Sequence, residues 1–342
     1  MGQSISVIVA VYNRFDLLKQ VVESILAQTC PVFEIILVDD GSIDETPNVL
    51  PRYIAERPTW RERVRYFYQE NQGQAAAANN GIARARGEWL AFNSNDDLWL
   101  PQKLEWQFRA IEKFKDKCAA CFTDAWFMNN PRMKMTLFQL AGRQHNEEIG
   151  MIADSVQYVS DVDPIFGVHP VWVQTLLVRA DLVRRIGGFD VKLRYGEDDD
   201  FVFRLARETS FCFVGMPMVL IDRTPSSQRH VGAGKNWDKV DYVLQMNQYR
   251  FEKRLRLCEC LPPKIQKVVR RRLSAVHSGW ANWYLRKDEC GKAREAMSKA
   301  AKYCLTPKIA FKWALTRFAP KLAKKVILMR EQNRADRSQG VG

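Results

Sequence analysis

The first 120 residues alternate between two hydrophobic periods, and this alternation limits the possible fold more than any other feature of the chain. Short β-branched runs, such as Ile5–Val11 and Phe33–Val38, suit strands that are buried on both faces. Between them, over residues 16–28, apolar side chains recur at helical spacing. Strands separated by helices at such short intervals predict βαβ units and an open, mainly parallel sheet flanked by helices. The expected fold class is therefore α/β.

The same two periods continue along the chain, with a gap at residues 133–160, where no clear period is found. Further strands are expected over Val64–Tyr68, Glu88–Phe92, Trp172–Val178 and Phe211–Val214. Further helices are expected over residues 75–85, 101–114, 181–186 and 199–208. Ser42 and Glu45 have the spacing of a capping box for the helix that follows them. Asp97 is expected to cap the helix that begins near Pro101.

The charge of the chain is divided unevenly along its length. The 342 residues carry a formal net charge of +13, from 52 Lys and Arg against 39 Asp and Glu. Residues 1–234 hold 26 basic and 30 acidic residues, whereas residues 235–342 hold 26 basic and 9 acidic ones. We therefore expect two domains, one over residues 1–235 and a basic helical region over residues 236–342, which meet different partners.

The basic region is expected to consist of helices over Tyr242–Leu257, Pro263–Leu285, Cys290–Tyr303 and Pro307–Met329. Its charge has three interpretations: a solvated face, a nucleic-acid surface, or a surface for anionic membranes. No nucleic-acid-binding module is recognisable, so nucleic acid is not an expected partner. We favour an anionic membrane because Lys321–Arg330 interleaves cations with apolar side chains. Five aromatic residues are candidates for the headgroup level: Trp280, Trp283, Tyr284, Trp313 and Phe318.

Several features bear on the compartment of the protein. No run approaches the ~18 apolar residues that a spanning helix needs, and the early run Ile5–Tyr12 lacks a basic leader and a cleavage site. The eight cysteines are scattered, which favours reduced thiols; Cys118 and Cys121 have metal-like spacing but no second pair, so they are expected to be buried small residues. The expected location is cytoplasmic, peripheral on the inner face of the plasma membrane.

Three acidic groups follow strands or precede a late helix: Asp39-Asp40, Asp96-Asp97 and Glu197–Asp200. In an open α/β sheet, ligands bind at the carboxyl ends of the strands. Acidic clusters that meet there repel each other unless a cation joins them, and hard carboxylate oxygens suit Mg²⁺ or Mn²⁺. Such ions also bind substrate phosphates, so a diphosphate ligand is expected. Neither common glycine-rich phosphate loop is present, which argues against an ATPase or a dinucleotide dehydrogenase.

Six segments, in order and over roughly residues 4–230, resemble the motifs of glycosyltransferase family 2. They are Val7–Arg14, Val38–Thr46, Asn71–Gly73 leading into Asn79–Ile82, Ala85–Glu88, Asn95–Pro101, and Gly187–Asp190 with Gly196–Asp198. The resemblance implies a GT-A fold, a nucleotide-diphosphate sugar donor, a divalent metal and inversion at the anomeric carbon.

The resemblance also implies which residues bind the nucleotide. Ala10, Val11 and Tyr12 match the segment that packs against the base and ribose. Asp39 matches the acid that hydrogen-bonds the edge of a pyrimidine, with Asp40 close by. The implied donor is therefore a UDP-sugar in preference to a TDP-sugar.

The metal site implied by the resemblance is the family's DxD signature, which here reads Ser94-Asn95-Asp96. Asp96 matches the acid that ligates the metal, Asn95 is grouped with the donor-binding residues, and Ser94 stands where the first acid is usual. Ala78 replaces an arginine often found in the family. His230 is the candidate for the family's histidine in a later loop.

The acceptor side completes the implied mechanism. Asp198 matches the base that deprotonates the acceptor hydroxyl, and Glu197 is its neighbour in the same motif. The expected function is sugar transfer to a hydroxyl of a glycan or lipid-linked acceptor in cell-surface polysaccharide biosynthesis. Two alternatives stay open: transfer to polyprenyl phosphate, where no hydroxyl needs deprotonation, and a catalytically silent nucleotide-sugar-binding protein, which the missing acid at Ser94 motivates.

Overall fold

The computed structural model describes residues 4–115, 117–128, 135–143, 145, 147–160, 170–222 and 240–339, with side chains in the last segment up to residue 329. The chain divides into two compact units, an N-terminal unit (Met1–Gly234) and a C-terminal unit (Lys235–Gly342). The domain boundary expected at residue 235 lies outside the described residues.

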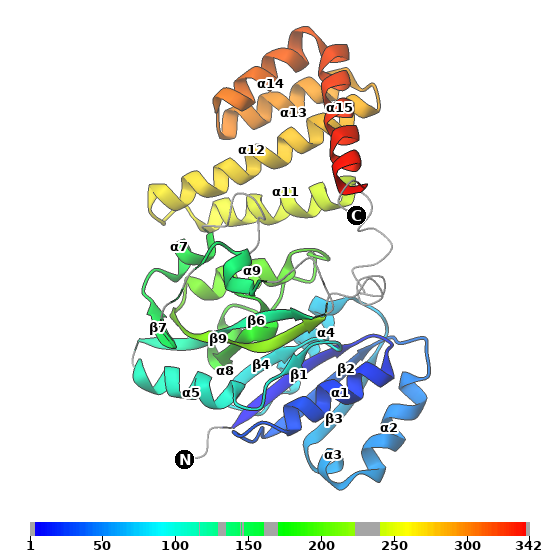
Figure 1. Cartoon of the computed structure of the whole chain (residues 1–342), viewed down its shortest axis with the longest axis vertical. Coiled ribbons are helices and arrows are strands. Elements are labelled where there is room, and N and C mark those ends of the chain that lie inside the picture. The colour runs from blue at the N-terminus through cyan, green and yellow to red at the C-terminus, as the bar shows by residue number, and fades with distance from the viewer. Residues whose placement is uncertain are drawn as a thin grey trace. The chain divides into compact units, whose positions relative to one another are not determined.

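The N-terminal unit is built on one sheet, in which the strand order is β3-β2-β1-β4-β8-β6-β9-β5, with β7 paired to β9 (Figure 1). The strands are β1 (Ile5–Val11), β2 (Glu34–Asp40), β3 (Val64–Gln69), β4 (Trp89–Asn93), β5 (Leu98–Trp99), β6 (Cys118–Met128), β7 (Ile149–Ile152), β8 (Leu176–Arg179) and β9 (Ser210–Asp222).

The sheet is parallel where the sequence most strongly predicts it. Strands β3, β2, β1 and β4 pair in parallel, as do β6 and β9. β8 runs antiparallel to both of its neighbours, β4 and β6, and β5 and β7 run antiparallel to β9. The expected α/β class is confirmed, and the sheet is mixed.

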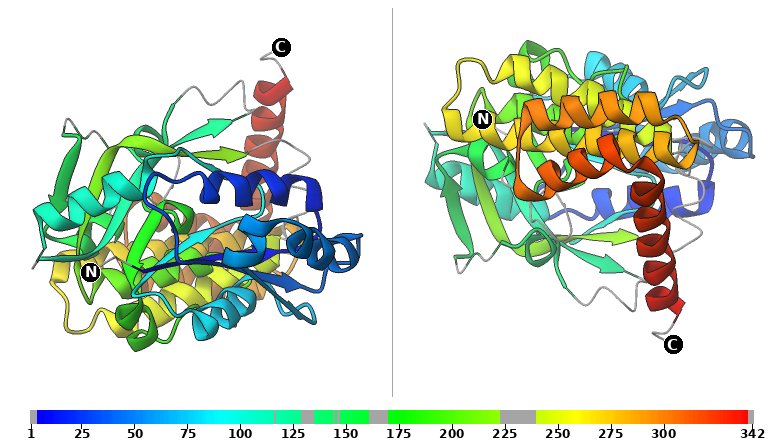
Figure 2. Two further views of the ribbon diagram at one scale, coloured as in Figure 1. Left: turned by 90° about the horizontal axis from the view of Figure 1, so that it is seen from below. Right: turned by 90° about the horizontal axis from the view of Figure 1, so that it is seen from above.

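Helices cover both faces of this sheet. In both views α1 and α4 lie on opposite sides of β1 and β2 (Figures 1 and 2). α1 buries Leu18, Val21, Val22 and Ile25, which is the apolar stripe that its sequence spacing predicts. The helical elements are α1 (Phe15–Leu26), α2 (Thr46–Glu56), α3 (Pro58–Arg63), α4 (Gln74–Arg84), α5 (Lys103–Lys113), α6 (Leu137–Leu140), α7 (Ser155–Ser160), the 3₁₀ helix η1 (Val173–Thr175), α8 (Ala180–Arg185) and α9 (Glu197–Ala206).

Two of the expected strands have different bounds. The strand expected over Trp172–Val178 begins with the 3₁₀ turn η1, and only Leu176 onward pairs with β4 and β6. The strand expected over Phe211–Val214 is much longer, because β9 continues through Gly215 and Pro217 to Asp222 with a shift of register against β6. Gly and Pro within an apolar run conceal such an irregular strand from a pattern search.

The C-terminal unit is helical, as its sequence predicts. It consists of α11 (Val240–Leu257), α12 (Pro263–Arg286), α13 (Cys290–Tyr303), α14 (Pro307–Phe318) and α15 (Pro320–Gln339). The single helix expected over Pro307–Met329 is wrong: Pro320 has no backbone N–H, and its ring moves Ala319 out of helical geometry, to φ −140° and ψ 63°. Among the residues described, no helix is long and apolar enough to cross a bilayer.

The aromatic residues of the C-terminal unit divide into two groups. Trp280, Tyr284 and Trp313 are partly buried and pack against a small core formed by alanines of α12 and α13 and by Met297. Phe318 is 77% exposed. Packing against the unit's own core stabilises the helices and covers part of each of those three rings.

Candidate active site

The carboxyl ends of β1, β2 and β4 bring the first group of expected residues to one edge of the sheet. Val11 is in register with Asp39, and Val9 with Asn93 at the end of β4. Parallel pairing places these strand ends side by side, so the loops that follow them are neighbours.

Asp39 is fully buried, and both of its carboxylate oxygens accept hydrogen bonds within the protein. The backbone N–H of Ser42 donates to Oδ1 (2.8 Å), and the hydroxyl of Tyr66 donates to Oδ2 (2.8 Å). Burial, together with this carboxylate, raises the pKa of Tyr66. The phenol therefore stays protonated and remains a donor to Asp39.

Asp40 organises the loop that leads into α4. Its Oδ1 accepts from the side-chain amide of Gln69 and the backbone N–H of Gln72 (2.8 Å each), and its Oδ2 accepts from the N–H of Gly73 (2.7 Å). Gly73 has φ 89°, a left-handed conformation that favours glycine. Asp40 thus holds the start of α4 against the end of β2.

The loop after β1 contains two consecutive residues in the left-handed region, Asn13 (φ 60°) and Arg14 (φ 65°). Hydrogen bonds to the loop after β2 hold them there. The N–H of Asn13 donates to Ser42 Oγ (2.7 Å), and the N–H of Arg14 donates to Asp44 Oδ2 (2.8 Å). The capping box expected at Ser42 is wrong, because this hydroxyl serves the β1 loop and α2 begins only at Thr46.

Asp96, the expected metal ligand, forms a buried ion pair with Arg14. The Arg14 Nη1 and Asp96 Oδ2 atoms are 2.8 Å apart, and the two side chains are 10% and 12% exposed. Burial raises the pKa of Asp96 and the nearby charge of Asp222 adds to this, while Arg14 acts in the opposite direction. Asn95 fixes the same turn to the β1 loop, since its amide donates to the carbonyl of Tyr12 (3.2 Å).

Asp97 joins three segments that are distant in sequence. Its Oδ2 accepts from Ser94 Oγ (2.5 Å) and from the side-chain amide of Gln174 (2.9 Å), and its Oδ1 accepts from the N–H of Asp222 (2.9 Å). The expectation that Asp97 caps the next helix is wrong, because α5 begins at Lys103 and the carboxylate is occupied here. Asp97 connects the turn after β4, the 3₁₀ turn η1 and the end of β9.

The second group of expected residues lies at the amino end of α9. Gly196, with φ 73°, precedes the helix, and Glu197 and Asp198 begin it. The Asp198 Oδ1 accepts from the N–H of Asp199 (2.7 Å), and acidic side chains in the first turn of a helix interact favourably with the helix dipole.

A buried ion pair anchors α9 to the preceding turn. Arg204 Nε lies 2.8 Å from Asp200 Oδ2, and the other guanidinium nitrogens donate to the carbonyls of Ile186 and Gly188. Asp200 therefore has a structural role, which holds the amino end of α9 in place.

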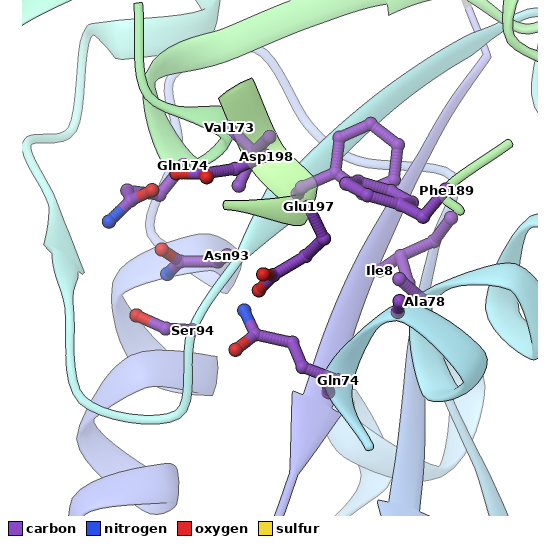
Figure 3. Close-up of a pocket in the computed structure, with 13 residues that line it drawn as sticks. Ile8, Gln74, Ala78, Asn93, Ser94, Val173, Gln174, Phe189, Glu197 and Asp198 are labelled. Atoms are coloured by element: carbon purple, nitrogen blue, oxygen red, sulfur yellow. The ribbon is translucent and has the colours of Figure 1, made fainter. Parts of the chain in front are cut away.

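One cavity, open to solvent, brings several of these elements together (Figure 3). Its walls come from the carboxyl halves of β1 and β4, the start of α4, η1 and the amino end of α9. The lining residues are Ile8, Ala10, Gln74, Ala75, Ala78, Phe92, Asn93, Ser94, Val173, Gln174, Phe189, Glu197 and Asp198. The carboxylate of Glu197 points into the cavity, toward the amide of Gln74 (Figure 3).

Of the residues expected from the sequence, Ala10, Glu197 and Asp198 line this cavity. Within the described part of the chain, its lining does not include Val11, Tyr12, Asp39, Asp40, Asn95 or Asp96. Val11, Asp39 and Asp40 lie at the carboxyl ends of β1 and β2, and Tyr12, Asn95 and Asp96 lie in the loops that follow β1 and β4. His230 lies outside the described residues.

The structure adds residues that the sequence analysis did not single out. Arg14 is the last residue of the motif Val7–Arg14, but no pattern in the sequence predicts that it pairs with Asp96. Gln174 and Asp222 are more than 70 residues from the turn at Asp97, and no local pattern signals such contacts.

The donor atoms near Asp96 suit a divalent ion that arrives with phosphates. Among the described residues, no group of three or more His, Cys, Asp and Glu side chains could hold a metal alone. Asp96 and the nearby Asp222 supply hard carboxylate oxygens, and Mg²⁺ is often held by one or two carboxylates plus substrate phosphates. The residues present therefore fit a metal whose remaining ligands come from the substrate.

Comparison with known proteins indicates the family that this chain resembles. The family model described as glycosyl transferase family 2 matches residues 6–161. An uncharacterized glycosyltransferase of Rickettsia typhi is 30% identical over 209 residues, which are 61% of this chain and 60% of the relative. The putative teichuronic acid biosynthesis glycosyltransferase TuaG of Bacillus subtilis is 40% identical over 119 residues, 35% of this chain and 45% of that protein. The chain thus spans about 60% or less of the length of these relatives.

Solved structures show the fold. The structure of S. aureus TarS 1–349 in complex with UDP-GlcNAc has a TM-score of 0.67 at 14% identity, and the match covers 97% of this chain and 92% of that one. The mannosyltransferase PcManGT from Pyrobaculum calidifontis, in complex with GDP-Man and Mn²⁺, has a TM-score of 0.52 at 20% identity over 94% of this chain and 86% of that one. The expected GT-A fold is confirmed, and residues 6–161 match the model of glycosyltransferase family 2.

Proposed function

We propose that this protein is an inverting glycosyltransferase that moves a sugar from a nucleotide-diphosphate donor, with a UDP-sugar favoured, to a hydroxyl of a glycan or lipid-linked acceptor. The observation that carries the proposal is the cavity at the carboxyl ends of β1 and β4, into which α9 presents Glu197 and Asp198. A site of this kind is where an open α/β sheet binds its ligand.

The two sides of the cavity suit different parts of the reaction. On one side, beyond the lining of the cavity itself, Tyr12, Asp39 and Asp96 at the carboxyl ends of β1, β2 and β4 mark the expected place of the nucleotide. On the other side, Asp198 takes the proton of the acceptor hydroxyl as that oxygen attacks the anomeric carbon. The bond to the nucleotide diphosphate breaks as the new glycosidic bond forms, so one displacement inverts the configuration.

Asp96, with Asp222 near it, would hold a divalent metal, Mg²⁺ or Mn²⁺. When bound, such an ion neutralises charge that develops on the departing diphosphate. Ser94 stands where the family's first acid is usual, and its hydroxyl donates to Asp97 (2.5 Å), so in this chain Ser94 supports the turn that carries Asp96.

The named relatives support the choice of substrates. The TarS structure contains UDP-GlcNAc, and TuaG is named for teichuronic acid biosynthesis, a cell-surface polysaccharide. PcManGT holds GDP-Man instead. We therefore propose a role in cell-surface polysaccharide biosynthesis, with the base to be tested directly.

A thermal-shift panel tests the donor. Purified protein is melted with UDP, TDP and GDP and with their sugars, each with Mn²⁺ and with EDTA. A ligand that binds only the native state raises the melting temperature. We expect the largest rise with a UDP-sugar and Mn²⁺. A panel in which no nucleotide diphosphate changes the melting temperature would remove the proposal.

Two alternatives give different results in simple assays. If the acceptor is polyprenyl phosphate, an Asp198→Asn variant keeps its activity, because a phosphate oxygen needs no base. If the protein only binds nucleotide sugars, it does not hydrolyse the donor slowly in the absence of acceptor. Metal-dependent hydrolysis that is lost in Asp96→Ala would count against this silent protein.

We also propose that the C-terminal unit attaches the enzyme to an anionic membrane on the cytoplasmic side. Phe311, Phe318 and Leu322 are 67%, 77% and 51% exposed, and the exposed Lys321 and Lys325 lie among them on α14 and α15. We call this set the apolar–basic surface. A basic residue near anionic lipid contributes about 1 kcal/mol, and inserted aromatic rings add apolar burial. A lipid-linked acceptor is found at such a membrane.

A further inference from the structure

The ion pair between Arg14 and Asp96 is the feature of the site that no expected role explains. It is nearly buried, with Arg14 Nη1 2.8 Å from Asp96 Oδ2. An arginine whose sole role was to neutralise the Asp96 carboxylate could come from any neighbouring helix, strand or loop. Here it comes from a left-handed backbone position (φ 65°), which non-glycine residues rarely adopt.

The surrounding contacts keep the arginine in that position. The Asn13 side-chain oxygen accepts from the N–H of Ile43 (2.9 Å), while Asp44 accepts from the N–H of Arg14 (2.8 Å). Asn95 donates to the carbonyls of Tyr12 and Asn13 (3.2 and 3.4 Å). Three loops therefore cooperate to direct one guanidinium at the carboxylate on which metal binding would depend.

We propose that Arg14 is the resident counter-ion of Asp96, that it competes with a divalent cation for this carboxylate, and that its guanidinium also binds the donor diphosphate, with or without the cation. This inference rests on the proposed function and deepens it. Two cations cannot share one carboxylate at close range without repulsion. A diphosphate offers both of them a partner, and the planar guanidinium matches phosphate oxygens with paired hydrogen bonds.

The proposal predicts effects of opposite sign for two ligands. Removing the guanidinium takes away a competitor for Asp96, so the metal alone binds more tightly. The same change removes a phosphate contact, so the nucleotide diphosphate without metal binds more weakly. A purely structural ion pair predicts otherwise, since its loss would disturb Asp96 and weaken both ligands or change neither.

The experiment compares full-length wild type with Arg14→Met, which keeps side-chain length but not charge. Arg109→Met is the matched control, because Arg109 is exposed on α5 and pairs with Glu105 (2.6 Å), away from the site. Binding of Mn²⁺ alone is followed by electron paramagnetic resonance of the free ion. Binding of UDP is followed by calorimetry in EDTA and in Mn²⁺.

For Arg14→Met we expect Mn²⁺ to bind about tenfold more tightly and UDP in EDTA to bind about tenfold more weakly than to wild type. Arg109→Met should match wild type in both. Arg14→Lys keeps the charge but loses the paired geometry, so we expect both of its affinities to lie between those of wild type and Arg14→Met. If Arg14→Met does not fold, the lysine variant provides the test, with changes of about threefold in the same two directions.

Unchanged or weaker Mn²⁺ binding in these variants would overturn the role of Arg14, and so would unchanged UDP binding in EDTA. In either case normal binding of UDP with Mn²⁺ by wild type leaves the proposed function standing. Failure of wild type to bind UDP, TDP or GDP even with Mn²⁺ would overturn both.

Discussion

The two units of this protein use their polar residues in opposite ways. In the N-terminal unit, charged side chains at the sheet edge are buried and fixed: Asp40 accepts three hydrogen bonds, and Asp97 also accepts three from distant segments. In the C-terminal unit, the cores are small and most of the described cations are exposed, as are apolar side chains such as Phe318, whereas Arg254 is a buried exception. The first arrangement suits chemistry that needs fixed geometry, whereas the second suits attachment to a surface that has no fixed shape.

The strongest test of this contrast is Asp198→Asn at the fixed site. We expect a loss of about 10²–10⁴-fold in kcat for transfer to a hydroxyl acceptor, because the amide cannot take the proton. Initial rates with saturating donor measure it. Glu197→Gln is the companion variant, since its carboxylate points into the same cavity. Full activity in Asp198→Asn would show that another group is the base.

Asp40→Ala tests whether the buried network holds the edge together. The change leaves the N–H groups of Gln72 and Gly73 without their acceptor, so we expect the free energy of unfolding to fall by about 3 kcal/mol. Urea unfolding measures this. Asp16→Ala is the control, because Asp16 is 82% exposed on α1, and its loss should change stability by about 0.5 kcal/mol or less. Equal effects of the two variants would contradict the contrast between fixed and solvated charges.

Lys103 provides a pH test of burial in the N-terminal unit. It is fully buried, its Nζ donates to Gln107 Oε1 (2.9 Å) and lies 3.9 Å from the centroid of Trp99, and burial lowers its pKa to about 7. Between this value and the ordinary value of 10.5, the unfolded chain binds more protons than the folded one, so stability rises with pH in that window.

We therefore expect wild type to gain up to about 1.4 kcal/mol per pH unit relative to Lys103→Met as the pH rises from 7 to 9. Urea unfolding at several pH values measures the difference, in which titrations common to both proteins cancel. Lys115→Met, a change at an exposed site, should leave the pH dependence as it is in wild type. A wild-type profile parallel to that of Lys103→Met would mean that Lys103 keeps its charge state across this range.

The smallest expected effect concerns the apolar–basic surface. The double variant Phe311→Ser, Phe318→Ser in the full chain should bind phosphatidylserine vesicles about tenfold more weakly, because two exposed rings lose their burial in the interface. Co-sedimentation with vesicles measures it. Phe33→Ser is the control, since Phe33 is 49% exposed in the N-terminal unit and should not affect binding. Equal binding by all three proteins would place the attachment elsewhere.

Sequence reasoning succeeded where local pattern decides the structure. The hydrophobic periods located β1, α1, β2 and β4, and the rule for ligand sites in open α/β sheets then predicted that Asp39-Asp40 and Asp96-Asp97 lie at one edge of the sheet. It failed where contacts between distant residues decide. Ser42 has the chemistry of a helix cap, but its hydroxyl accepts a hydrogen bond from the loop after β1. Asp97 accepts hydrogen bonds from residues 174 and 222, which lie too far along the chain for a local sequence pattern to include them. The break at Pro320 was readable from the sequence, because proline cannot continue a helix interior.

The three hydrogen bonds that Asp97 accepts have a consequence for the construction of chimeras between this protein and its relatives. A loop transplanted at residues 94–97 alone would lose the amide of Gln174 and the backbone N–H of Asp222 as its partners. Substitutions at positions 174 and 222 would in turn have the same effect as substitutions in the turn at residues 94–97, although neither position belongs to that turn. Successful chimeras therefore need to exchange the turn at residues 94–97, η1 and the end of β9 together.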